Sequence, residues 1–434
     1  MIILKNIKFI ILSAYSPKDI EIASLRIEKL GKYISKKYNT IIISGKPLKQ
    51  KTKYDIGNSK LIEVDYKIFS KNNNEKKVPT LNKPNKKINK YSIYGHLEYF
   101  LPIAPGGKRL YNIRKMKSVL ENEIANFEGK IFLIASYGPY FILKLAIKLK
   151  QKYKNKIYLI EDFRDMIGKF NPHHSTNIFI ENTISKIIKK ADIVLTVSKY
   201  MGKRFIKYYG LNSKKLYVLY NGIDKNNIFE KSNIDKNNKF KIVYTGSLYE
   251  NANGSIIPFL EALKKMKKQT LKNLEFIYCG KDFEFINNIF DKYKLNNILT
   301  NKGIVNREES IKLQKNADLL LLITYTGNEP DEGIDIISGK FFEYLVSGKP
   351  ILNIGNKDWE LKEDLEIDGV SKVIEAKNIE DIKKYIERMC LERQKLNFKK
   401  RKEIIDKYIF EVSIEKFLTK ICLAQNQEER NEKF

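Results

Sequence analysis

The stretch DEGIDIISGKFFEYLVSGKPIL, Asp331–Leu352, decides our interpretation of the fold because it joins an acidic loop, a helix start and a strand. Ser338 suits the N-cap of a helix that begins at Gly339 and Lys340, since its hydroxyl can accept a hydrogen bond from a free backbone N–H. Such a helix start attracts anions through its free N–H groups and its positive dipole end. Lys340 adds a full positive charge beside it. We therefore predict an anion site here.

Glu343 extends this site toward a sugar, because it stands one helical turn beyond the helix start and near the same face. A diphosphate at the helix start would leave this carboxylate within reach of a sugar diol. Gly348–Pro350 then ends the helix, and Ile351–Ile354 is typical of the next strand. The stretch as a whole predicts a binding site for a nucleoside diphosphate.

Short apolar runs alternate with longer helical patterns on both sides of this stretch. Continuous apolar strands separated by amphipathic helices indicate parallel sheets that are covered on both faces. Two such series predict an α/β protein with two doubly wound, Rossmann-like domains. The predicted strands are Ile7–Ser13, Thr40–Ser44, Leu61–Val64, Ile131–Ala135, Ile157–Ile160, Ile193–Val197, Leu216–Tyr220, Phe240–Tyr244, Leu274–Tyr278, Leu319–Ile323, Ile351–Ile354 and Lys372–Ile374.

The polar, Asn-rich segment 221–238 predicts the break between the two domains. We expect a first domain at 1–222 and a second domain at 239–395. A helical tail at 396–434 is expected to pack back toward the first domain. The Lys- and Asn-rich segment at about 67–90 is low in complexity and predicts an insertion in the first domain.

Polar residues follow several of the predicted strands, where ligands of open parallel sheets bind. We expect two such domains to face each other across a cleft that these residues line. The segments concerned are Ser13–Pro17, Ser136–Pro139, Glu161–Asp165, Gly246–Asn251 and Gly280.

The formal net charge is +30, which is consistent either with solvated lysine surfaces or with attraction to phosphate on nucleotides, lipid head groups or nucleic acid. Three scattered cysteines predict neither a disulfide framework nor a zinc site, and a reducing cytoplasm fits them. No run approaches the roughly twenty apolar residues that span a bilayer, so any membrane contact is expected to be peripheral. The basic and aromatic segment 91–115 suits either a membrane interface or a loop packed on the domain surface.

A series of motifs in the second half occurs in the order found in one enzyme family. Together they resemble the family 4 glycosyltransferases, which have the two-domain GT-B architecture. The motifs are ADIVLTVSKYMGKRFIKYYGLNSKKLYVLYNGID (191–224), FKIVYTGSLYENANG (240–254), LEFIYCGKD (274–282), GIVNREES (303–310), NADLLLLI (316–323) and the stretch quoted first.

The first half resembles the branch of that family that assembles bacterial surface polysaccharides, on YSPKDIEIASLRIEKLGKYISKKYNTIII (15–43) and IEDFRDMIG (160–168). The resemblance implies a retaining sugar transfer from a nucleotide diphosphate to a glycan, often one carried on a polyprenyl lipid. It implies work at the cytoplasmic face of the membrane, no metal in the active site and no cofactor besides the nucleotide sugar.

The resemblance also assigns donor-site residues. Glu343 matches the carboxylate that binds the ribose hydroxyls, and Asp335 stands where the family has a glutamate facing the donor sugar. Gly280 and the Val305 backbone fall where the base is held. Many members follow the glycine of the Gly246 turn with an Arg and a Lys.

This chain departs from the family at those two cations, because it has Ser247 and Asn253 there. Lys340 is then our first choice to balance the phosphate charge. Arg26 is the second, with pairing to a neighbouring carboxylate as its alternative. Ser247 remains able to donate to a phosphate oxygen.

On the acceptor side, Arg164 and Asp165 are the best candidates. Asp165 suits either orienting or deprotonating the acceptor hydroxyl, and the alternative is a buried Asp–Arg pair that shapes the loop. His173 and His174 are adjacent and have no acidic or Cys partner at ligand spacing, which argues against a metal site.

Two other functions remain open from sequence. A nucleotide-sugar epimerase of the same architecture would need acid and base residues near the sugar. A nucleic-acid-binding protein is suggested by charge alone, without a helix-turn-helix, RNA-binding or zinc signature.

Overall fold

The computed structural model describes residues 6–20, 22–68, 100–101, 109–170, 178–225, 239–248 and 254–431. The chain divides into two compact units, and each is described by itself. The first comprises Met1–Val197, Met201–Leu219 and Ile414–Phe434. The second comprises Ser198–Tyr200 and Tyr220–Ser413.

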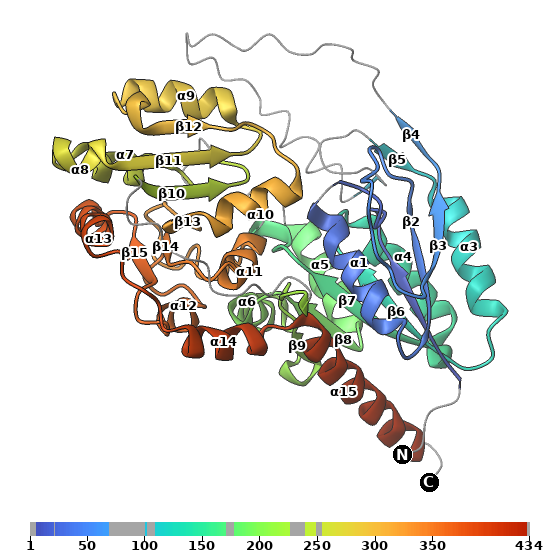
Figure 1. Cartoon of the computed structure of the whole chain (residues 1–434). Helices are drawn as coiled ribbons and strands as arrows, with labels where there is room; N and C mark the ends of the chain where they lie inside the picture. The colour runs from blue at the N-terminus through green and yellow to red at the C-terminus, as the bar shows by residue number, and fades with distance from the viewer. Residues whose placement is uncertain are drawn as a thin grey trace. The chain divides into compact units, whose positions relative to one another are not determined.

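The first unit is built on a seven-stranded parallel sheet with the order β3-β2-β1-β6-β7-β8-β9 (Figure 1). Its central strands are mainly apolar and buried on both faces, as in IKFIIL of β1, where all six residues are buried. The strands are β1 (Ile7–Leu12), β2 (Asn39–Gly45), β3 (Lys60–Val64), β6 (Lys130–Ser136), β7 (Ile157–Phe163), β8 (Ile193–Thr196) and β9 (Leu216–Val218). A separate antiparallel pair joins β4 (Tyr66–Ile68) to β5 (Arg109–Tyr111).

Helices cover both faces of this sheet. One face shares a core with α3 (Ile113–Ala125), α4 (Phe141–Lys152), α5 (Ile178–Lys190) and α6 (Lys199–Tyr209). The opposite face packs against α1 (Ile22–Ile34), where Gly31 lies against Ile42 of β2. The last helix, α15 (Phe410–Asn431), contacts β9 through the rings of Phe417 and Tyr217.

The second unit is built on a six-stranded parallel sheet with the order β12-β11-β10-β13-β14-β15. Its strands are β10 (Phe240–Thr245), β11 (Leu274–Cys279), β12 (Leu299–Asn301), β13 (Leu319–Ile323), β14 (Ile351–Gly355) and β15 (Lys372–Glu375). One face packs on α7 (Ile257–Lys264), α9 (Phe283–Lys292) and α13 (Ile379–Glu392). The other packs on α11 (Gly339–Val346), α12 (Lys362–Glu366) and α14 (Phe398–Lys407). Two further helices are α8 (Lys268–Lys272) and α10 (Arg307–Lys315).

A buried ion pair connects helix α14 to the rest of the second unit. The Arg401 guanidinium pairs with Asp368, and both side chains are fully buried. Arg401 also donates to the Ser371 hydroxyl at 2.8 Å. Arg401 of this helix therefore neutralises the buried carboxylate of Asp368, which lies in the turn before β15.

The predicted fold class is confirmed, and every predicted strand forms. Three short strands, β4, β5 and β12, were not predicted. Strand β7 runs to Phe163 instead of Ile160, so Glu161 and Asp162 lie within a strand and not after it. No helix in the described ranges is both long and apolar enough to cross a bilayer.

Several predictions fall outside the described residues. These are most of the insertion at 67–90, most of the predicted break at 221–238, and the side chains His173, His174 and Asn253.

Candidate donor site in the second unit

The candidate site lies at the carboxyl ends of the strands in the second unit. Strand β10 is flanked by β11 on one side and β13 on the other, so the strand order reverses there (Figure 1). Open α/β sheets bind ligands outside such a reversal point. The turn after β10, the turn after β11 and the loop from β13 to α11 all start at this edge.

Two glycines allow the first two turns to approach each other. Gly246 has φ +104°, a conformation that side-chain-bearing residues rarely adopt. Its N–H donates to the Cys279 carbonyl at 2.7 Å, and the Gly280 N–H donates to the Gly303 carbonyl at 2.8 Å. A Cβ on Gly280 would collide with the Gly246 carbonyl oxygen. Both positions thus require glycine, as the predicted nucleotide-binding turns do.

Ser338 caps α11 as predicted from sequence. Its hydroxyl accepts a hydrogen bond from the Lys340 N–H at 3.3 Å, and Gly339 has open space around its Cα. The Lys340 side chain turns to the Gly246 turn, where its Nζ donates to the Tyr244 hydroxyl at 2.7 Å and to the Ser247 carbonyl at 3.3 Å. The structure thereby brings Ser338, Gly339, Lys340, Gly246 and Ser247 together.

The charge of Lys340 depends on its surroundings. Burial is the largest influence and lowers the pKa of Lys340 to about 8, while the negative charges of Glu343 and Asp282 act in the opposite direction. The ammonium therefore predominates at neutral pH. A bound diphosphate would raise this pKa again, because an adjacent anion favours the charged form.

Glu343 is half-buried one turn after the helix start, as predicted. Its carboxylate forms an ion pair with Arg307 of α10, with Nη2 and Oε1 3.1 Å apart. The backbone of Val305, two residues before Arg307, hydrogen-bonds the Cys279 thiol. Val305 thus lies beside the end of β11 and next to the turn that contains Gly280.

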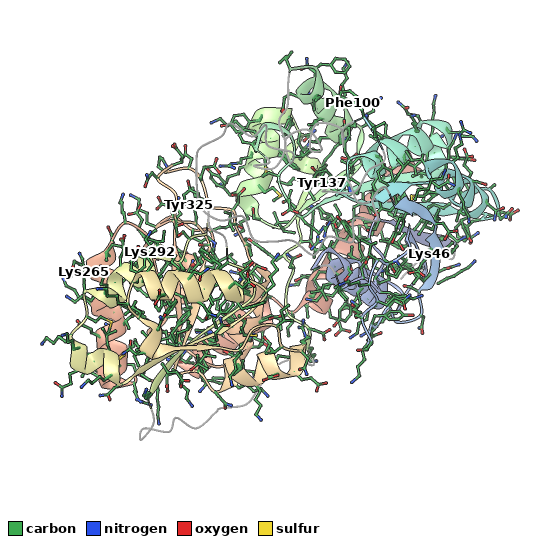
Figure 2. The ribbon with its side chains drawn as sticks, turned by 90° about the horizontal axis from the view of Figure 1, so that it is seen from above. Lys46, Phe100, Tyr137, Lys265, Lys292 and Tyr325 are labelled. Atoms are coloured by element: carbon green, nitrogen blue, oxygen red, sulfur yellow. The ribbon has the colours of Figure 1, made fainter. Side chains whose placement is uncertain are left out.

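Asp335 lies in the loop that leads into α11, and its side chain is buried. Both flanking residues are held by the turn after β14: the Glu360 N–H donates to Ile334, and the Trp359 indole donates to the Ile336 carbonyl at 2.9 Å. Tyr325, at the start of this loop, is labelled in Figure 2. The loop therefore holds Asp335 in a defined position.

Sequence reasoning missed several residues that build this site. Tyr244 holds Lys340, and Arg307 pairs with Glu343. Tyr344, next to Glu343, accepts a hydrogen bond from the Thr245 N–H at 3.0 Å and so fastens α11 to β10. The tyrosines resemble ordinary core residues in sequence, because strand and helix periodicity already accounts for them. Arg307 lies in the quoted motif GIVNREES, two residues after Val305, and that position was the available signal.

Arg26, the second candidate for phosphate, is instead a buried structural residue. Only 3% of its side chain is exposed, and its Nη2 lies 2.6 Å from an oxygen of the fully buried Asp162. Arg26 also donates to the Leu219 carbonyl at 3.0 Å. The alternative of pairing with a neighbouring carboxylate therefore describes Arg26, and we do not retain it as a phosphate ligand.

Arg164 and Asp165 follow β7 in the first unit. Arg164 Nη2 donates to the carbonyl of Tyr137 at 2.9 Å, and Tyr137 is labelled in Figure 2. Asp165 is exposed, and within the described part of the chain it forms no ion pair with Arg164. Glu161, expected among the residues after the strand, is fully buried within it.

The second unit also has a hollow with a volume of about 610 Å³. Residues of α7, α9 and α13 and residues directly after α7 and α9 line it, and Lys265 and Lys292 among them are labelled in Figure 2. None of the candidate residues lines it. Among the residues that the structure describes, no three His, Cys, Asp or Glu side chains are grouped as metal ligands.

Residues 79–227 match the family model described as Glycosyltransferase Family 4. This match confirms the predicted resemblance and lies largely in the first unit, whereas most of the quoted motifs lie in the second. It supports a transferase, as predicted. No curated protein sequence matches the chain.

Solved structures with the same fold include several glycosyltransferases. HepE from Anabaena in complex with UDP is 13% identical, with a TM-score of 0.63 over 96% of this chain and 100% of that one. A glycosyltransferase from Rickettsia africae is 14% identical, with a TM-score of 0.60 over 96% and 97%. The lipopolysaccharide outer core galactosyltransferase WaaB is 11% identical, with a TM-score of 0.58 over 95% and 99%. At these identities the likeness establishes the GT-B fold.

Proposed function

We propose that the chain is a retaining glycosyltransferase that moves a sugar from a nucleoside-diphosphate donor to a glycan or polyprenyl-linked glycan in bacterial surface polysaccharide synthesis. One observation carries the proposal: the Lys340 ammonium lies at the Gly246 turn, beside a capped helix start and at the reversal point of a parallel sheet. Backbone N–H groups and a fixed cation are what a diphosphate requires.

The proposed position of the donor rests on the residues that gather there. Lys340, Gly339 and Ser247 would receive the diphosphate. Glu343 would bind the ribose diol, and the base would lie near Gly280 and Val305. HepE, which shares the fold, was crystallised with UDP, and this supports a nucleotide-sugar donor.

The chemical step follows from charge. As the sugar leaves, negative charge develops on the diphosphate, and oriented donors that already point at it stabilise that charge. In the retaining mechanism that the family implies, the leaving phosphate accepts the proton of the acceptor hydroxyl on the same face. Asp335 would face the donor sugar. No metal or further cofactor is part of this proposal.

The acceptor is assigned to the first unit, where Arg164 and Asp165 would contact it. The Nε atom of Arg164 is buried without a hydrogen-bond partner in the described part of the chain, which leaves a donor for an incoming group. We further propose that the protein works at the cytoplasmic face of the membrane as a peripheral protein. The exposed side chain of Phe100 (Figure 2), with Lys144 Nζ 5.8 Å from the centre of its ring, and the net charge of +30 suit an anionic surface.

Incubation with a panel of UDP- and GDP-sugars tests this function. We expect slow release of free nucleotide from the correct donor without acceptor, and faster release with a glycan-lipid extract. Sugar isomerisation without nucleotide release would favour the epimerase instead. Absence of binding to every nucleotide, measured by calorimetry, would reject the donor site, and EDTA should leave turnover unchanged.

A further inference from the structure

Lys340 reaches the Gly246 turn through a contact that none of the predicted site residues supplies. Its Nζ donates to the Tyr244 hydroxyl at 2.7 Å and lies 4.3 Å from the centre of the same ring. Tyr244 is the penultimate residue of β10, and only 2% of it is exposed. The hydroxyl in turn donates to the Ser247 carbonyl at 2.7 Å.

We propose that Tyr244 is a positioning residue that holds the Lys340 ammonium at the Gly246 turn, where the donor diphosphate is expected. This inference rests on the proposed function, because it deepens the role of the same site. It explains how a lysine from α11 can stand in for the cations that the turn itself does not supply.

The geometry leaves Lys340 few other positions. A Cβ on Gly246 would lie 2.5 Å from Lys340 Cε, so the lysine stem lies directly over the glycine. The described residues provide no carboxylate within ion-pair distance of Nζ. Tyr244 and the Ser247 carbonyl are both neutral acceptors, so they orient the ammonium without cancelling its charge.

Holding the ammonium also keeps it charged. The ionisable groups around Lys340 are Tyr244 at the end of β10, Asp282 after β11, and Glu343 on α11, which is itself paired with Arg307. A hydroxyl oxygen and a ring face both favour the cation over the neutral amine. Burial opposes them. Removing the hydroxyl should therefore leave burial less opposed and lower the pKa of Lys340 further.

Competitive acetylation tests this without any nucleotide. Whole protein is treated with limiting acetic anhydride from pH 6 to 11, and acetylation of Lys340 is followed by mass spectrometry. In the wild type we expect half-maximal reactivity near pH 8. In Tyr244→Phe, which keeps the ring, we expect it about one pH unit lower, as loss of a hydrogen bond to a charged group predicts.

Tyr385→Phe is the matched control, because this buried tyrosine also loses one hydroxyl hydrogen bond, to the Val370 carbonyl at 2.9 Å, but on α13. In this control, the pH dependence of Lys340 acetylation should equal that of the wild type. An unchanged profile in Tyr244→Phe overturns the inference. Acetylation of wild-type Lys340 at the rate of an exposed lysine over the whole pH range also overturns it, because Lys340 would then not be held against Tyr244, and this measurement does not depend on a variant that folds.

A second measurement separates this inference from the proposed function. UDP affinity is measured by calorimetry at pH 7 and pH 9 for the wild type and both variants. Wild-type affinity should fall about tenfold over this interval, because a proton must then be taken up on binding. If the wild type does not bind UDP or GDP, the donor site fails while the acetylation result still decides the role of Tyr244.

Discussion

The guanidinium of Arg26 and the carboxylate of Asp162 form an ion pair from which solvent is excluded, with Nη2 and Oδ1 2.6 Å apart. The Ser136 hydroxyl adds a hydrogen bond to the same carboxylate at 3.3 Å. Asp162 lies on β7, an interior strand of the sheet, and Arg26 reaches it from α1. The pair therefore ties a helix to the middle of the sheet, and its role is in stability.

Arg26→Ala should destabilise the first unit by roughly 3–5 kcal/mol, because it leaves a buried carboxylate without its cation. Denaturant unfolding followed by circular dichroism measures this. Lys46→Ala is the control, since Lys46 pairs with Asp65 where both side chains are more than half exposed. The control should unfold like the wild type, and equal stability of the Arg26 variant would contradict a structural pair.

Glu343→Ala should weaken binding of the donor more than tenfold, because charge-assisted hydrogen bonds to the ribose hydroxyls contribute about 1.5–3 kcal/mol each. Calorimetry with the nucleoside diphosphate measures the change. Glu363→Ala, which removes an exposed acid of α12, provides the comparison. Unaltered affinity of the Glu343 variant would remove this residue from the site.

Lys340→Ala should reduce kcat about a hundredfold, and this loss should exceed the loss of donor affinity. The reason is that negative charge on the diphosphate grows as the sugar departs. Steady-state kinetics at saturating donor measures kcat, and calorimetry measures affinity. A loss of donor affinity with an unchanged kcat would instead indicate that Lys340 binds the ground state as strongly as the transition state.

Gly246→Ala should abolish turnover while the protein stays folded. The new methyl group would displace Lys340 Cε, in addition to straining a backbone with φ +104°. Gly369→Ala separates the two effects, because its φ is +80° and its Cβ would meet no atom within 4 Å. The control should lose stability alone. Full activity in Gly246→Ala would show that Lys340 tolerates displacement.

Glu161→Gln should raise stability most clearly at alkaline pH. Both carboxylate oxygens of Glu161 are buried without a hydrogen-bond partner in the described residues, and burial raises its pKa to about 8. A raised pKa means that the folded state binds more protons than the unfolded chain from pH 4.5 to 8, so stability falls with rising pH over that range. Denaturant midpoints at pH 4.5, 6, 8 and 9 should fall less steeply in the variant. Parallel profiles would contradict this.

The sequence predicted the sheets well because apolar strands and amphipathic helices carry distinct periods. The end of β7 was missed because Glu161 and Asp162 are charged, and charge usually marks a strand end. Here Asp162 is neutralised by Arg26, which is 136 residues away in sequence, and periodicity cannot reveal such a partner.

The part of the candidate site that lies at the start of α11 was predictable from sequence. Ser338, Gly339, Lys340 and Glu343 are close in sequence, so capping rules alone placed them. Tyr244 could not be found in this way, because it lies 96 positions from Lys340 and its hydroxyl stands at the end of a buried strand. Only the folded sheet brings these two side chains together.

The cation that α14 contributes to the second unit has a practical consequence for dissecting the enzyme. A fragment that stops at Lys395 would omit Arg401 and leave Asp368 buried beside Ser371 with no counter-ion. Such a truncated lobe should aggregate or require acidic buffer, whereas one that ends beyond Lys407 retains its own neutralising group. Expression trials of the isolated second unit should therefore extend past α14.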